Sequence, residues 1–74
     1  MEREQLVANL EIAKWQVHDG DIQIVKQKQL IAKLSAIGSD TTSAEQGLKI
    51  LRLMQDSHRI QLEWFLEALG KLPE

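Results

Sequence analysis

Apolar residues recur every three or four positions in two long stretches of this chain, and a short polar break separates the stretches. Residues 3–37 and residues 41–70 both lack proline and are rich in Leu, Ala, Glu, Gln and Lys, which favour helices. Gly70 and Pro73 mark the end of the second stretch. The pattern predicts a helix over about residues 3–37, a turn at 38–41 and a helix over about 41–70.

The polar break contains the residues that end one helix and begin another. Gly38 can adopt the left-handed backbone conformation that closes a helix. Asp40 can accept a backbone N–H at the start of the next helix, and Thr42 followed by Glu45 offers an alternative cap. Because a short loop between helices of similar length makes them antiparallel neighbours, we predict one all-α domain over residues 1–74, folded as a long, coiled-coil-like hairpin.

One side of each predicted helix carries a continuous seam with alternating steps of three and four residues, which is the spacing of helices that pack as coiled coils. In the first helix the seam is Leu6, Leu10, Ala13, Val17, Gly20, Ile24, Gln27, Ile31 and Leu34. In the second helix it is Ala44, Leu48, Leu51, Gln55, His58, Leu62, Phe65 and Leu69. We expect these two seams to pack against each other.

The segment around Gly20 is the weak point of the first helix, because glycine inside a helix costs about 1 kcal/mol relative to alanine. A turn there would instead make a three-helix bundle. The alternating three-and-four spacing of the seam continues unchanged through Gly20. A turn at Gly20 would not require this spacing to be kept. The unbroken phase favours a continuous helix.

Four seam positions are not apolar, and we predict that Gly20, Gln27, Gln55 and His58 fix the register of the hairpin. If the turn centres near residue 40, the numbers of facing residues add to about 80. Gln27 then faces Gln55 as a buried amide pair, and Gly20 makes room for the His58 imidazole. Polar groups inside an apolar seam fix register at some cost in stability.

A second set of apolar residues lies away from the seam. In the first helix it contains Ala8, Ile12, Trp15, Ile22 and Val25, and in the second Ile50, Leu53, Ile60 and Trp64. Contiguous exposed apolar surface usually marks an interface, and tryptophan is a common anchor. Scattered exposed apolar residues are also normal on proteins, and long Lys or Arg stems can cover them. We expect an interface, with these contact candidates: Trp15, Ile22, Ile50, Leu53, Ile60 and Trp64.

The composition limits the classes of partner and the location that we expect for this chain. The chain has 9 Lys and Arg against 11 Asp and Glu, with no basic run or one-sign face, so no nucleic acid partner is expected. Its apolar runs are far too short for a membrane span. The charged N-terminus has no signal-peptide core, and we expect a cytoplasmic protein. Small chains bury a small fraction of their surface. Such chains are therefore only marginally stable on their own. Because the lack of cysteine excludes disulfides, we expect oligomerisation to supply the missing stability.

No residue pattern for chemistry is complete. His18 and His58 fall on different predicted helices, too far apart to share a metal within one chain. Asp19 and Asp21 flank a glycine, but the remainder of a calcium loop is absent. The serines and threonines have no His/Asp arrangement, and there is no glycine-rich phosphate loop. We expect no enzyme activity, no metal and no cofactor.

The stretch Ala13-Lys14-Trp15-Gln16-Val17-His18-Asp19-Gly20 leads into Ile24, Gln27, Leu30, Ile31 and Leu34, then into Gly38-Ser39-Asp40-Thr41 and, later, His58. In this order the chain resembles, over about residues 6–69, a group of short hypothetical bacterial proteins. That group is similar in its ladder of Gly, Ile, Gln and Leu, its Gly-x-Asp-Thr turn and its central His. It differs at Trp15 and Gln16. The resemblance implies a bacterial helical hairpin in which Gly20 and His58 are structural, and it implies no activity.

The sequence therefore favours a non-catalytic interaction or structural module, a homodimer of hairpins that forms a four-helix assembly and can also bind an unidentified protein. Two alternatives remain open at this point. One is a helix pair that lies on a lipid surface, which the apolar residues permit and the acidic balance disfavours. The other is a nucleic-acid-associated regulator, which the charge disfavours.

Overall fold

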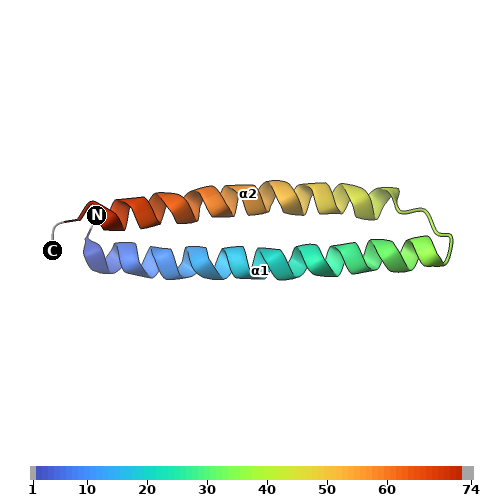
Figure 1. Ribbon diagram of the computed structural model, residues 1–74, viewed down its shortest axis with the longest axis horizontal. Helices are drawn as coiled ribbons and strands as arrows, with labels where there is room; N and C mark the ends of the chain where they lie inside the picture. The colour runs from blue at the N-terminus through green and yellow to red at the C-terminus, as the bar shows by residue number, and fades with distance from the viewer. Residues whose placement is uncertain (1, 73–74) are drawn as a thin grey trace.

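The computed structural model describes residues 2–72 and consists of two antiparallel helices, α1 over Arg3–Ala36 and α2 over Thr42–Gly70. They lie side by side along their whole length, so that the start of α1 and the end of α2 share one end of a rod (Figure 1). The rod measures 58 × 14 × 13 Å. The predicted all-α hairpin is confirmed, and each helix bound at the turn differs from its predicted position by one residue.

Gly38 ends α1 through hydrogen bonds that need its left-handed backbone, with a φ of 74°. The backbone N–H of Gly38 donates to the carbonyl of Ser35 (3.1 Å), and the N–H of Ser39 donates to the carbonyl of Leu34 (2.9 Å). This pair of bonds satisfies carbonyls that the end of a helix would otherwise leave free. The role predicted for Gly38 is confirmed.

Asp40 starts α2. Its Oδ1 accepts hydrogen bonds from the Thr42 hydroxyl (2.7 Å) and the Thr42 backbone N–H (2.9 Å). The hydroxyl bond first, and the backbone bond second, hold the pKa of the Asp40 carboxyl below its ordinary value, because both stabilise the charged form. The alternative cap on Thr42 is wrong, since Thr42 already lies inside the helix and its hydroxyl is used by Asp40.

Gly20 lies within α1, which runs without interruption from Arg3 to Ala36. The predicted continuous helix is confirmed, and the three-helix alternative is excluded. Every predicted seam position in both helices is buried or half-buried. Within the two helices, three further residues are also shielded: Asn9, Gly47 and Ala68. The three-and-four spacing therefore identified the packed side of each helix.

The tightest packing lies at the end of the rod away from the turn. Leu6, Leu10, Ala13 and Phe65 form the buried hydrophobic core there, and Leu62, Ala68, Leu69 and Leu72 pack against it. Toward the turn the seam residues are only half-buried. The middle of the hairpin therefore depends more on polar contacts than the end does.

The bonds to Asp40 predict a response to acid. A carboxyl whose pKa is lowered in the folded state stabilises it above the ordinary pKa, and this contribution is lost as pH falls through the folded pKa. The melting temperature should fall below about pH 4, and Asp40→Ala should lower it at neutral pH and flatten this acid limb. Asp56→Ala, which removes an exposed carboxylate within α2, is the control. Equal pH profiles for the two variants would contradict the assignment.

Candidate functional site

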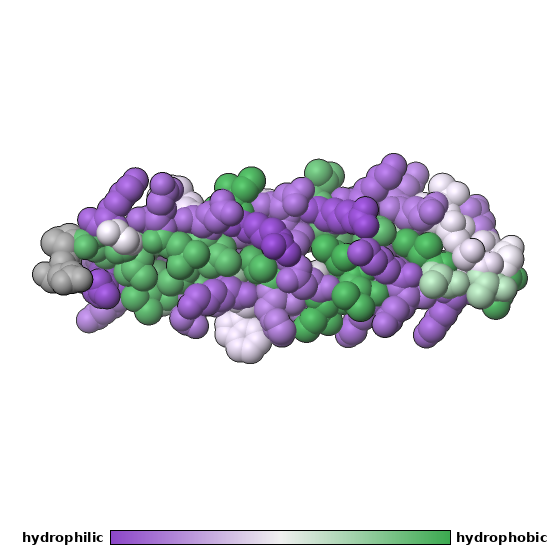
Figure 2. Space-filling view, viewed as in Figure 1, coloured by the Kyte–Doolittle hydropathy of each residue, from purple (hydrophilic) through white to green (hydrophobic). Residues whose placement is uncertain are grey.

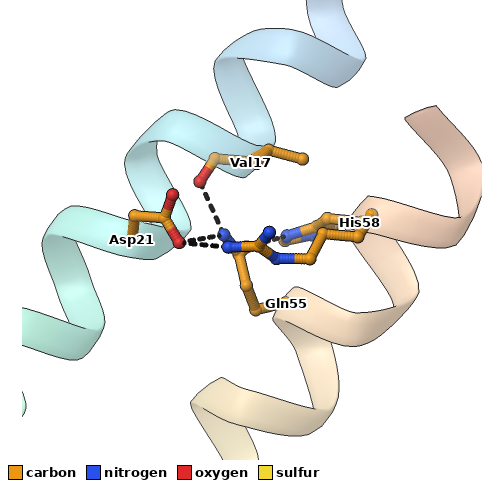
Figure 3. Close-up of polar contacts among 5 residues, drawn as sticks. Val17, Asp21, Gln55 and His58 are labelled. Atoms are coloured by element: carbon orange, nitrogen blue, oxygen red, sulfur yellow. Dashed lines mark hydrogen bonds and ion pairs between the residues drawn. The ribbon is translucent and has the colours of Figure 1, made fainter. Parts of the chain in front are cut away.

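Gln55 is the one buried polar side chain among the described residues, only 3% exposed. Its Nε2 donates to the backbone carbonyl of Val17 (2.6 Å) and to Oδ1 of Asp21 (2.8 Å), so it crosses from α2 to α1 (Figure 3). Its Oε1 lies 3.3 Å from Nδ1 of His58. Because an amide oxygen only accepts, this contact requires a proton on Nδ1 of His58. The buried amide therefore has a partner at both ends.

Gly20 makes this position possible. A Cβ on residue 20 would lie 2.6 Å from Cδ of Gln55 and would also overlap its Oε1. The Gln55 carboxamide thus occupies the space that any other residue at position 20 would fill. The absence of a side chain lets the two helices hold a buried amide between their backbones.

A second contact of the same kind lies nearer the turn, with the roles of the helices exchanged. Gln27 of α1 donates through Nε2 to the backbone carbonyl of Ala44 (2.8 Å). A Cβ on Gly47 of α2 would lie 2.9 Å from that Nε2. In both contacts a glutamine of one helix lies on a glycine of the other and bonds the carbonyl three residues before that glycine. We call these the two glutamine–glycine contacts.

These contacts correct the predicted register. The buried Gln27–Gln55 amide pair is wrong, because each glutamine bonds a backbone carbonyl of the opposite helix instead. Gly20 accommodates Gln55 rather than His58. Facing residue numbers add to about 75, as in Gly20 with Gln55 and Gln27 with Gly47, and not to about 80. A glutamine side chain is long enough to reach a backbone carbonyl when a glycine opens the way, and this decides the register.

Asp21 extends the Gln55 contact to the surface. The same Oδ1 that accepts from Gln55 also accepts from Nη2 of Arg59 at 2.9 Å. Both side chains of this ion pair are about half exposed, so the pair itself contributes about 1 kcal/mol or less. The sequence reading missed Asp21 and Gly47. Gly47 could have been found as a second glycine inside a predicted helix, directly before the seam residue Leu48.

The six predicted contact residues are all exposed, from 40% at Ile22 to 70% at Leu53. They do not form one surface. Trp15 and Ile22 lie on the side of α1 opposite its seam, and Leu53 and Ile60 lie on the corresponding side of α2, since residues three or four apart share a face. These pairs therefore line the two opposite long edges of the rod. In Figure 2 apolar side chains protrude along the edge formed by α2.

Other chemistry is sparse. The Trp15 indole and the His18 ring form an edge-on pair with centroids 5.9 Å apart. Over residues 2–72 no group of three or more His, Cys, Asp or Glu side chains is placed to hold a metal ion. Neither described helix combines the length and apolar character needed to cross a membrane. The candidate site therefore consists of the two glutamine–glycine contacts and the exposed apolar side chains around them.

Comparisons with known proteins give no family for this chain. A scan of protein-family models, a search of curated proteins and a search of solved structures each found no match. The resemblance to short bacterial proteins, and the bacterial origin that it implies, therefore stay predictions.

The Gln55–Gly20 contact predicts an unusual effect of a Gly→Ala change inside a helix. Alanine favours a helix over glycine by about 1 kcal/mol, yet Gly20→Ala should destabilise the hairpin by about 1–3 kcal/mol because its Cβ overlaps the Gln55 carboxamide. Thermal or urea unfolding would measure this.

The matched control is Gly70→Ala, where no atom lies within 4 Å of the added Cβ. In a Gln55→Ala background the penalty of Gly20→Ala should disappear or change sign, since the overlapping group is gone. A penalty of the same size in both backgrounds would show that Gly20 does not accommodate Gln55.

Proposed function

We propose that the chain is a small non-catalytic interaction or structural module that acts as a homodimer of helical hairpins. The observation that carries the proposal is the distribution of apolar residues. Thirteen large apolar side chains among the described residues are exposed, whereas four hydrophobic residues are buried. Exposed apolar surface on this scale is typical of a protein that associates.

The surface area supports the same proposal. The hairpin exposes 5723 Å², whereas a folded monomer of 8.5 kDa typically exposes about 4,700 Å². The excess of about 1,000 Å² is comparable with the ~800 Å² that each partner buries in a standard interface. A second copy packed along the rod would cover an area of this size.

A cytoplasmic location is part of the proposal. It is supported by the mixed charges and by the lack of cysteine, which suits a reducing compartment. Binding of an unidentified protein partner is compatible with a dimer that leaves other exposed apolar residues uncovered.

The proposal predicts a dimer in solution. Light scattering over a range of concentrations should give a mass of twice 8.5 kDa, shifting toward the monomer on dilution, with helicity recorded by circular dichroism at each step. Apolar burial between copies is the physical reason. A well-folded helical monomer at every concentration would contradict the proposal.

A further inference from the structure

The two broad faces of the rod differ in charge. Beside the seam, one face of α2 carries Lys49, Arg52, Asp56, Arg59 and Glu63 in steps of three and four residues. The Arg59–Asp21 ion pair joins this face to α1. On α1 the corresponding positions include Glu11, Lys14, Asp21 and Lys28. We call this the charged face.

The opposite broad face carries fewer charges, and its α2 half has none between Ile50 and Ala68. On α2 it consists of Ile50, Met54, Ser57, Gln61, Trp64 and Ala68. On α1 it consists of Ile12, Gln16, Asp19, Gln23, Lys26, Leu30 and Lys33. We call this the low-charge face.

A shallow groove between the helices shows that these two rows of side chains share one face. Near Gly20 the groove is lined by Gln16, Asp19 and Gln23 from α1 and by Met54 from α2. Nearer the turn, Gln23 and Lys26 line its continuation together with Ile50. The low-charge face is therefore a continuous surface along the rod, and its charged side chains are Asp19, Lys26 and Lys33, all on α1.

We propose that the low-charge face binds the same face of a second copy of this chain, with the two turns at opposite ends of the assembly. This inference rests on the homodimer proposed above and specifies its interface. Ile12, Ile50, Met54 and Trp64 are each at least 50% exposed on this face. Packing two such faces removes these side chains from water and gives a bundle of four antiparallel helices.

The two charges nearest the middle of this face, Asp19 and Lys26, favour one direction of the second copy. Asp19 and Lys26 are seven residues apart, two turns along one side of α1. When α1 packs antiparallel on α1 of a second copy, the two-fold axis brings Asp19 of each chain beside Lys26 of the other. Neither residue forms an ion pair among residues 2–72, although Asp19 accepts a hydrogen bond from Gln23 (2.8 Å). Both are therefore available for a partner.

The alternative two-fold arrangement, with both turns at the same end, places α1 against α2 of the second copy. The low-charge face of α2 has no charged residue between Ile50 and Ala68. Asp19 and Lys26 would then be covered without a partner of opposite charge, which is costly. The pairing of Asp19 with Lys26 thus favours the arrangement with the turns apart.

The geometry gives this dimer nearly full overlap. The midpoint between Asp19 and Lys26 lies three residues from the midpoint of α1. The two rods are therefore offset along their length by only a small part of that length. The broad face measures 58 × 14 Å, which matches the ~800 Å² per partner of a standard interface. Ile50 and Trp64 lie inside this interface. Leu53, Ile60, Trp15 and Ile22 lie at the long edges and remain outside it.

Charge reversal tests the interface. Asp19→Lys and Lys26→Asp should each raise the dimer dissociation constant by on the order of tenfold, because each sets like charges side by side twice in the assembly. The double variant Asp19→Lys/Lys26→Asp should restore the wild-type constant, since the pairs form again with their signs exchanged. Lys28→Asp is the matched control, because it makes the same change two residues away on the charged face. Analytical ultracentrifugation would measure the constants, and circular dichroism would confirm equal helicity.

The outcomes separate this inference from the proposal on which it rests. A wild-type dimer that Asp19→Lys and Lys26→Asp weaken no more than Lys28→Asp would overturn the low-charge interface and leave the homodimer standing. A wild-type chain that stays monomeric would overturn both.

The direction of the second copy has its own test. The chain has no cysteine, so Ser39→Cys accepts a single spin label in the turn. With the turns at opposite ends, the two labels in a dimer should lie about 50 Å apart, from 1.5 Å per helical residue on either side of the axis. With both turns at one end they would lie within about 20 Å. A short distance in pulsed electron resonance would overturn the proposed direction.

Discussion

The buried carboxamide of Gln55 is the constraint on which the rest of the hairpin depends. An amide removed from water is costly unless its donors and acceptor are satisfied. At its observed place Gln55 reaches the Val17 carbonyl, the Asp21 carboxylate and the His58 ring, and Gly20 leaves space for it. A shift by one helical turn would put the amide against a residue with a side chain and away from these partners. The apolar seam alone would tolerate such a shift, so the amide and the glycine define the register.

The contact of Gln27 with Gly47 repeats this constraint in the opposite direction. Each helix thus supplies one glutamine and one glycine, and both contacts place a side-chain amide on a backbone carbonyl of the other helix. Two such contacts some turns apart hold the less tightly packed middle of the rod, while the apolar core closes the end away from the turn. On α2 the charged residues gather on one broad face and the apolar and neutral residues on the other, and this division supports the proposed association.

Much of this could be predicted from the sequence. The spacing of Leu, Ile and Ala predicts the seam because it follows directly from the helical repeat, and it also indicates that the helix continues through Gly20. Gly38 and Asp40 predict the turn because their roles are local. The register could not be predicted in this way, since a ladder with a seven-residue repeat looks alike at every turn. Gly47 was missed because it lies one position outside the seam. The exposed apolar residues do not form the single contiguous surface that their spacing predicts, because the sides of two helices that face away from each other form opposite edges.

The most direct test of the account is to observe which side chain lies on Gly20. In a nuclear Overhauser spectrum of the folded chain, the side-chain amide protons of Gln55 should give strong cross-peaks to the Gly20 α protons, since the carboxamide fills the space of the missing Cβ. The same spectrum should show the Gln27 side-chain amide close to Gly47. Cross-peaks from Gly20 to the His58 ring, without any to the Gln55 amide, would place the helices in a different register and contradict the account.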